Sequence, residues 1–340
     1  MSFTRVWAIL KIRNKEFYRD KGALAWVFLF PVIMILAFGY IFDVESQSTY
    51  KIGYSKIEEL KAVKMSKWVY YATKEEALLK LKNQLIDLYV DLEKKPPLYY
   101  KSESSPKSAI AEVLFLDNLR AKELTPNRNA PTKKEIQGRV VKYLDWVFPG
   151  IICMNVMFMS MWGVGWVVVR QRRTGVLKRF KASPIKPIEY LLAQILSRLF
   201  IISLSGIILF AGAHLIYPFH TEGSYMNMFI IYVLGTFSLS SFGLIVAARI
   251  QSEEFANGLL NFFTYPMMFL SEIWFSLEGS NEWIRFIAKF MPLWHMTNGL
   301  RKIMNEGAGI VDLMPSIIIL TSISLFFTLI GSYLFKWTKS

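Results

Sequence analysis

Residues 170–187 read RQRRTGVLKRFKASPIKP and lie between two long apolar runs of the chain. Seven Lys or Arg residues fall between positions 170 and 190, against a single acidic residue, Glu189. A short loop this basic between two membrane spans is expected on the cytoplasmic side of a membrane. The stretch therefore predicts an integral membrane protein and fixes the side on which this loop lies.

The centre of the loop has the pattern of a short amphipathic helix. Val176, Leu177 and Phe180 are apolar at helical spacing, and charged residues stand between them. Gly175 suits one end of such a helix and Pro184 the other. Two interpretations stay open: the positive charge serves only to fix the topology, or the helix is a docking site for a soluble partner.

The composition agrees with a membrane protein that also carries a polar domain. Apolar residues make up 53% of the chain, aromatic residues 15% and charged residues 19%, with a net charge of +14. Nucleic-acid binding is excluded as the reason for the charge, because the aromatic residues lie in apolar runs and not among Lys and Arg. The single cysteine, Cys153, excludes an intrachain disulfide and a thiolate metal cluster. No metal site is predicted.

Six apolar runs are long enough to cross about 30 Å of hydrocarbon at about 1.5 Å per residue. They cover residues 23–42, 147–169, 191–217, 228–248, 256–277 and 313–335. The first run is too long and too late for a cleaved signal peptide, so it is expected to stay as an anchor.

The distribution of Lys and Arg predicts the orientation. Residues 1–22 carry six of them and loop 170–190 carries seven, whereas loop 218–227 carries none. The bias of basic residues toward cytoplasmic loops places both termini and loop 170–190 in the cytoplasm. Segment 43–146 then lies outside.

Residues 1–22 resemble a helix that lies in the plane of the membrane surface. Phe3, Val6, Trp7 and Leu10 recur at helical spacing and Lys and Arg occupy the rest of the helix. Trp7 and Leu10 are the candidate residues of this face. Two roles stay open, an elbow that couples a partner's movement to the first span and a simple anchor.

Segment 43–146 is long enough for a small domain. Strand patterns fall at residues 50–54, 68–71, 86–92 and 98–101, and helical patterns at 74–83 and 108–121. The alternation at 86–92 predicts a strand with one buried face. Ile110, Val113 and Leu114 are the expected buried stripe of the second helix. This order predicts an α+β fold with its helices on one face of a small sheet, followed by a flexible return at 125–132.

The predicted fold class is thus a membrane α-helical protein. It has six transmembrane helices, an inserted small α+β extracytoplasmic domain and an N-terminal interfacial helix.

A few polar residues stand within or near the spans, but they are scattered over depth. Arg198 and His214 lie near opposite ends of the third run, and His295 lies in an outer loop. Glu272 is roughly 24 Å along the fifth run from its start. A carboxylate in a membrane is a candidate functional residue, although a structural glutamate in contact with water fits equally well. Catalysis needs such groups gathered at one depth. A membrane enzyme acting on lipid, or a sensor with an outer domain, is therefore the alternative and not the main hypothesis.

Two motifs resemble those of permease subunits of the ABC type-2 exporter family. Between the second and third spans, a basic stretch is followed by Gly175-Val176-Leu177 and then by Pro184. Before the last span, Pro292-Leu293-Trp294-His295 is followed by Gly299-Leu300-Arg301. The match departs from the family pattern at Glu272, where a small residue is usual.

This resemblance implies a mechanism. The chain has no G-x-x-x-x-G-K-[ST] motif, so the family would place ATP and Mg on a separate cytoplasmic ABC ATPase and no cofactor on this chain. The ATPase would dock on the helix at 175–180, flanked by Arg172 and Arg173, with Val176, Leu177 and Phe180 inserted into its groove.

The resemblance also implies the setting and the cargo. A second permease, identical or a sister chain, would complete the pathway in a bacterial inner membrane, and a periplasmic adaptor is a further candidate partner. The cargo would be amphipathic, lipid-like or drug-like. Glu272, His295 and Arg301 are the candidate pathway or structural polar residues.

Overall fold

The computed structural model describes residues 2–41, 50–54, 66–91, 98–103, 105–121, 132–136, 143–216, 219 and 221–337. The chain forms two compact units. The helical unit comprises Met1–Ile41, Leu144–Phe275 and Trp283–Ser340. The sheet unit comprises Phe42–Tyr143 and also Ser276–Glu282, a segment that the sequence did not assign to the inserted domain.

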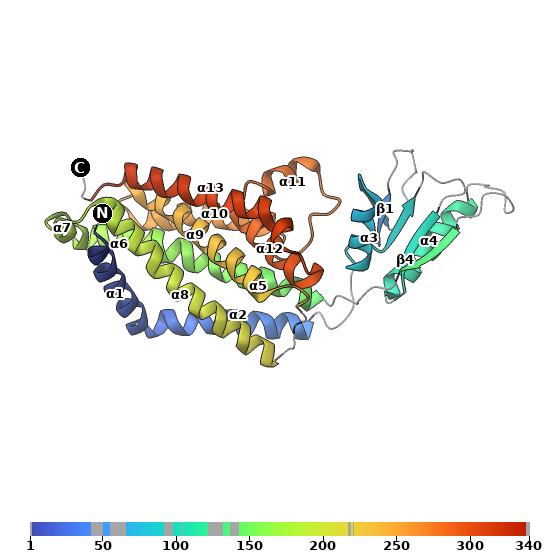
Figure 1. Ribbon diagram of the computed structural model, residues 1–340, viewed down its shortest axis with the longest axis horizontal. Helices are drawn as coiled ribbons and strands as arrows, with labels where there is room; N and C mark the ends of the chain where they lie inside the picture. Colours follow the sequence, from blue (N-terminus) through green and yellow to red (C-terminus); the bar gives the residue numbers. More distant parts are fainter. Residues whose placement is uncertain are drawn as a thin grey trace. The chain divides into compact units, whose positions relative to one another are not determined.

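The helical unit is built mainly of long helices (Figure 1). Its elements are α1 (Phe3–Arg19), α2 (Lys21–Ile41), α5 (Tyr143–Met161), η1 (Trp162–Trp166), α6 (Val167–Arg173), α7 (Val176–Lys181), α8 (Pro187–Ile216), α9 (Tyr225–Arg249), α10 (Glu253–Leu270), α11 (Glu282–Ala288), α12 (Pro292–Glu306) and α13 (Ile310–Leu334). Here η1 is a π-helix. It joins α5 and α6 into one continuous span.

Five helices among the described residues are long and apolar enough to cross a membrane. They are Lys21–Phe38, Tyr143–Arg173, Pro187–Leu215, Tyr225–Arg249 and Ile310–Leu334. The mainly helical membrane fold is therefore confirmed, and these five helices coincide with five of the six predicted runs.

The predicted full span at 256–277 is not confirmed. Helix α10 has 18 residues, or about 27 Å at about 1.5 Å per residue. It opens with two glutamates and ends at Leu270, and residues 271–277 are not helical. Glu272 follows with a positive φ of 57°. The chain then forms the two short helices α11 and α12 before α13 begins. The apolar run is thus divided between a helix and a turn, which composition alone does not distinguish.

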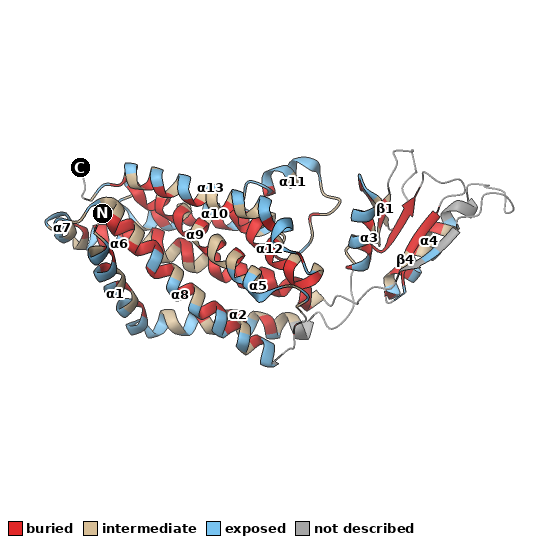
Figure 2. Cartoon of the chain, in the orientation of Figure 1, coloured by how far each residue is buried: buried red, intermediate tan, exposed pale blue. Residues whose placement is uncertain are grey.

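Helix α9 lies at the centre of the bundle, packed against α8, η1, α12 and α13. Figure 2 shows it as largely buried, whereas α13 exposes one side. Gly165 and Gly243 allow η1 and α9 to touch backbone to backbone, because a Cβ on Gly165 would lie 3.0 Å from the Gly243 carbonyl oxygen. Ser241 and Thr328 share a 2.9 Å hydrogen bond between α9 and α13.

The sheet unit holds a five-stranded mixed sheet in the order β2-β1-β3-β4-β5. Its elements are β1 (Tyr50–Tyr54), β2 (Ser66–Tyr70), α3 (Lys74–Lys82), β3 (Leu88–Asp91), β4 (Leu98–Ser102), α4 (Pro106–Ala121) and β5 (Thr132–Ile136). Strand β1 pairs in parallel with β2 and β3, β3 is antiparallel to β4, and β4 is parallel to β5. The strands and helices predicted before residue 122 are present, with ends shifted by a few residues.

The two helices lie on opposite faces of this sheet, and the prediction that they share one face is wrong. On one face Tyr89 packs with Ala77 and Leu81 of α3. On the other, Val90 packs with Ala111 and Phe115 of α4. Successive strand residues point to opposite faces, so all four residues of β3 are buried. A strand covered on both sides need not alternate, which is why its polar residues misled the prediction of one buried face.

Two further predictions for this unit differ from the structure. Ile110 and Val113 are exposed and α4 buries Ala111 and Phe115 instead, a face displaced by about one position around the helix. Thr132, predicted as the end of a flexible return, begins β5. The rest of that return, residues 125–131, lies outside the described residues.

The segment Ser276–Glu282 packs on the sheet unit through its own side chains. Leu277 is buried. The Glu278 carboxylate lies 3.5 Å from Lys80 Nζ of α3 and accepts a 3.3 Å hydrogen bond from the Tyr71 hydroxyl. Gly279 has a φ of 72° and its Cβ position would lie 3.0 Å from Val69 of β2. The loop that leaves α10 is therefore part of this unit.

Candidate functional site

The corner between α6 and α7, residues 167–181, is the candidate site predicted for a partner. Helix α6 ends at Arg173, and Gly175 turns the chain with a φ of 77°, in the left-handed region that glycine occupies without strain. Nothing lies within 4 Å of its Cβ position, so the backbone conformation and not lack of space requires glycine here. Helix α7 then begins at Val176.

One face of α7 is buried in the chain's own interior. Leu177 is fully buried among Val6, Val168 and Leu191. Phe180 is half-buried, with its ring centroid 5.4 Å from that of Tyr190. The prediction that Leu177 inserts into the groove of a partner is therefore wrong. The amphipathic pattern is real, but its apolar face is satisfied by helices α1, α6 and α8.

Arg172 is also buried, and it joins the ends of two other helices. Its guanidinium donates to the carbonyl oxygens of Ala247 at 2.9 Å, Ala248 at 3.1 Å and Lys336 at 3.0 Å, and to that of Ile250. The last carbonyls of a helix have no partner within the helix. Arg172 supplies partners at the end of α9 and just beyond the end of α13. The prediction that it flanks a docking surface is corrected: it holds the corner to the bundle.

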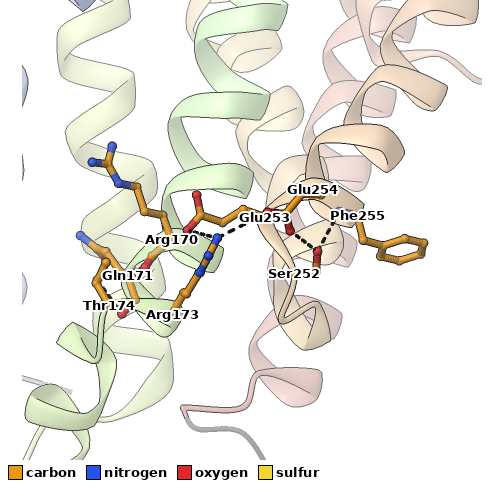
Figure 3. Close-up of polar contacts among 8 residues, drawn as sticks. All are labelled: Arg170, Gln171, Arg173, Thr174, Ser252, Glu253, Glu254 and Phe255. Carbon is orange, nitrogen blue, oxygen red and sulfur yellow. Dashed lines mark hydrogen bonds and ion pairs between the residues drawn. The ribbon is translucent and has the colours of Figure 1, made fainter.

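Arg173 is exposed and connects the corner to α10. Its guanidinium lies 3.4 Å from Glu253 and 3.5 Å from Glu254, in the first turn of α10 (Figure 3). Ser252 caps this helix by accepting a 3.1 Å hydrogen bond from the Phe255 amide. Exposed ion pairs contribute little stability. This one nevertheless places the end of α6 beside the start of α10.

Aromatic side chains pack around Tyr190 next to the corner, and no sequence pattern pointed to this cluster. Tyr190 contacts Phe335 at 5.7 Å and Trp337 at 5.5 Å, measured between ring centroids. The Tyr190 hydroxyl also donates to Gln171. The start of α1, α7 and the end of α13 therefore meet at one end of the helical unit (Figure 1). Only their positions in space reveal this.

The outward surface of the corner is basic. Lys178, Arg179 and Lys181 are exposed on α7, and Val176 is half-exposed. Because the apolar face points inward, these charges are what the corner presents to a partner. They suit recognition of an acidic surface.

Glu272 and Arg301 are brought together by the fold. Arg301 Nη1 lies 3.7 Å from the Glu272 carboxylate, and Nη2 donates to the Glu272 carbonyl oxygen at 2.8 Å. The guanidinium stacks on Trp146, 3.8 Å from the ring centroid, and Trp294 Nε1 donates to Glu272 at 3.3 Å. This cluster ties the start of α5 to α12 and to the turn after α10. It accounts for Glu272 as a paired, partly buried residue.

His295 lies on the same helix as Arg301 but has different partners. It is buried, with Nε2 2.7 Å from the Lys289 carbonyl oxygen and Nδ1 3.2 Å from the Ser316 hydroxyl. Burial lowers the pKa of His295, and the hydrogen bond to Lys289 opposes this only in part. Such a neutral imidazole donates through Nε2 and accepts at Nδ1. It fastens α12 to the end of α11 and to α13.

Helix α1 has two apolar sides. Val6, Ile9 and Phe17 are buried, and the helix packs on α8. Trp7 is 48% exposed and stacks on the exposed Phe3, and Leu10 is half-exposed. The expected face for a membrane surface is thus narrower than predicted, because Val6 points inward.

The structure also places the remaining polar candidates. Arg198 is buried in α8 and donates a 2.8 Å hydrogen bond to the Gly163 carbonyl oxygen. His214 stacks on Phe210 near the other end of the same helix, with ring centroids 6.3 Å apart. Among the described residues, no three His, Cys, Asp or Glu side chains are grouped so that they could hold a metal ion.

Comparison with known proteins identifies the family of the chain. A model of the ABC-2 family transporter proteins matches residues 21–333. The daunorubicin resistance ABC transporter permease protein DrrB1 of Streptomyces coeruleorubidus is 24% identical over 177 residues, which is 50% of this chain. The match spans 61% of that relative's length. The family match extends from α2 to α13 and includes the corner described above. This multi-pass membrane protein belongs to the ABC-2 family of transporter proteins.

Proposed function

We propose that the chain is the permease subunit of an ABC exporter and moves an amphipathic, lipid-like or drug-like cargo outward. The energy would come from ATP bound with Mg on a separate cytoplasmic ABC ATPase. The family match supports the permease role. The single observation that carries the coupling is the α6–α7 corner, because it is held to the bundle on its inner side and basic on its outer side.

The corner suits the transmission of force because it is joined to three helices at once. Arg172 holds the ends of α9 and α13, and Arg173 forms an exposed ion pair with the start of α10. A push on α7 would therefore reach these helices without first deforming a loop. A loop that served only to fix the topology needs charge but none of these bonds.

A second permease would complete the pathway, and α10 offers the surface for it. Exposed residues on one side of this helix recur at alternating spacings of three and four: Phe255, Gly258, Phe262, Tyr265 and Phe269. This is the spacing of a seam between two helices. Helix α10 is too polar to be one of the five apolar spans. Its exposed side is therefore better suited to contact with another protein chain than with lipid alone.

The cargo and the setting are proposals of the same kind. The name of the relative DrrB1 associates that protein with resistance to daunorubicin, so a drug-like cargo is the first to test for this chain. The excess of Lys and Arg in residues 1–22 and 170–190 supports cytoplasmic termini in a bacterial inner membrane. The sheet unit would then lie outside, where a periplasmic adaptor could reach it.

Reversal of charge on α7 tests the proposal. Tagged wild-type protein, purified from its native membrane in mild detergent, should carry an ABC ATPase with it. The double variant Lys178→Glu, Arg179→Glu should lose that ATPase, because an acidic rim on the partner would be repelled. A matched control, Lys11→Glu with Lys15→Glu on the exposed side of α1, should retain it. Recovery of the ATPase with both variants alike would contradict docking at this corner.

A further inference from the structure

The long helix that ends in the coupling corner is interrupted at its middle by a π-helix. The segment Trp162–Trp166 reads WGVGW and separates α5 from α6 within the continuous span Tyr143–Arg173. A π-turn holds one more residue than an α-turn, and such turns are frequent at functional sites. They are also among the few places at which a helix bends sharply.

The π-turn redirects backbone hydrogen bonds. In a regular helix the amide of Val167 would donate to the carbonyl of Gly163, four residues earlier. Here it donates to the carbonyls of Trp162 and Val164 instead. The Gly163 carbonyl oxygen accepts a 2.8 Å hydrogen bond from Arg198 Nε of α8. A charged side chain from another helix thus replaces a bond that the helix does not make.

The contact depends on glycine at position 163. A Cβ there would lie 2.7 Å from Arg198 Nε and 2.9 Å from Cδ, so any other residue would displace the guanidinium from this carbonyl. On its other side the guanidinium lies over the ring of Phe17 of α1, 5.4 Å from the centroid. Arg198 is therefore enclosed between α1 and η1. A charged side chain within a membrane span is rare and marks a candidate functional position.

The two halves of the span are held differently. The cytoplasmic half, α6, is joined through Arg172 and Arg173 to the ends of α9, α10 and α13. The outer half, α5, belongs to the core of the bundle and is buried along most of its length. Any movement of α6 relative to α5 must be taken up between them, where η1 lies.

We propose that η1 is the hinge of this span and that Arg198 is the positioning residue that sets it. This rests on the proposed function, because the movement considered is the one imposed on α7 by an ATPase. With Arg198 in place, the span returns to one defined bend after each displacement. Without it, the Gly163 carbonyl loses this hydrogen bond and the π-turn opens to several conformations.

The first experiment uses the permease alone in detergent and so does not depend on the ATPase. In hydrogen–deuterium exchange, Arg198→Leu should speed exchange of the amides at 164–168 by at least about tenfold, because a hydrogen bond from a charged donor is lost. Amides of α9 should be unchanged. Arg198→Lys, which keeps a cationic donor, should restore most of the protection. An equal rise in α9 would show that Arg198 only packs the bundle and would overturn the proposal.

The second experiment measures the hinge itself in the complex with its ATPase. The single cysteine is removed as Cys153→Ala, and spin labels are placed at the exposed Lys178 of α7 and at the half-exposed Tyr143, the first residue of α5. Trapping the ATPase with vanadate and ADP should change the distance between the labels. Deletion of Val164, which converts the π-turn to a regular α-turn and keeps both halves in register, should abolish the change.

The matched control for the deletion is Val164→Ala, which loses packing but keeps the π-turn and should behave as wild type. Arg198→Lys should also keep the distance change, and Arg198→Leu should lose it. A deletion variant that moves like wild type would show that η1 is not the hinge. If no ATPase co-purifies with the wild type, the proposed function fails, and the exchange experiment still decides the role of Arg198.

Discussion

At the scale of single residues, Arg172 has the largest structural role in the corner. A guanidinium has five donors in a fixed planar arrangement, and this one reaches carbonyls at the ends of two helices. Its contacts with the carbonyls of Ala247 and Ala248 are buried in the last turn of α9. Such carbonyls have no intrahelical partner, so the loss of these hydrogen bonds costs free energy. The neighbouring Arg170 is exposed, with its guanidinium 5.1 Å from the Trp166 ring centroid.

We predict that Arg172→Leu lowers the free energy of unfolding in detergent by at least about 3 kcal/mol, because several hydrogen bonds from a charged donor are lost. Arg172→Lys should be intermediate, since an ammonium cannot reproduce the planar fork. Arg170→Leu, a matched change two residues away, should alter the stability by no more than about 1 kcal/mol. Denaturant titrations followed by tryptophan fluorescence measure this. Equal losses for positions 170 and 172 would contradict the role assigned to Arg172.

At the scale of elements, the loop Ser276–Glu282 links two parts of the chain that are far apart in sequence. Its flanking residues belong to the helical unit, yet Glu278 is paired with Lys80 of the sheet unit and Leu277 is buried. The domain inserted between the first two spans is thus also connected to the segment between α10 and α11.

We predict that residues 42–143, expressed alone, give a mixed α/β circular dichroism spectrum and a low midpoint of thermal unfolding. Appending residues 276–282 through a Gly/Ser linker should stabilise the domain by about 1.5–3 kcal/mol, the contribution of a buried Leu side chain. The same fusion with Leu277→Asp should give no gain. A fusion no more stable than the domain alone would show that this loop does not stabilise the sheet unit.

At the scale of the whole molecule, the exposed side of α10 is where a second copy is expected. The side chain of Phe262 is 67% exposed at the middle of the seam, and Phe326 of α13 is 58% exposed in another apolar surface. The two residues are equally aromatic and similarly accessible. They differ in the helix that carries them, because α13 is one of the five apolar spans and α10 is too polar to be one.

We predict that Phe262→Cys, in a Cys153→Ala background, forms disulfide-linked dimers when membranes are treated with a mild oxidant. Two cysteines facing each other across a symmetric seam meet the distance that a disulfide requires. Phe326→Cys should stay monomeric under the same conditions, with cross-linking judged on non-reducing gels. Cross-linking at position 326 and not at 262 would move the dimer seam to α13.

The sequence was sufficient for the membrane class, the family and most of the element pattern. Composition, apolar run length and the bias of Lys and Arg are properties of local sequence. They determine directly which segments enter the bilayer and in which orientation. For this reason five of the six runs coincide with helices that can cross a membrane. The sixth was misjudged because Leu270 ends α10 within an apolar run, and a turn and a helix can share one composition.

The candidate site could be located from the sequence, but the sequence could not show which of its residues are exposed. Periodicity showed that Leu177 belongs to an apolar face, and only the positions of α1, α6 and α8 decided that this face points inward. A basic stretch did not distinguish the buried Arg172 from the exposed Arg173. The pairing of Glu272 with Arg301 and the contact of Arg198 with Gly163 join residues 29 and 35 positions apart. Sequence therefore determined what each segment is, because that depends on its neighbours in the chain. The tertiary structure decided what each charged or apolar side chain does, because that depends on partners brought together only by folding.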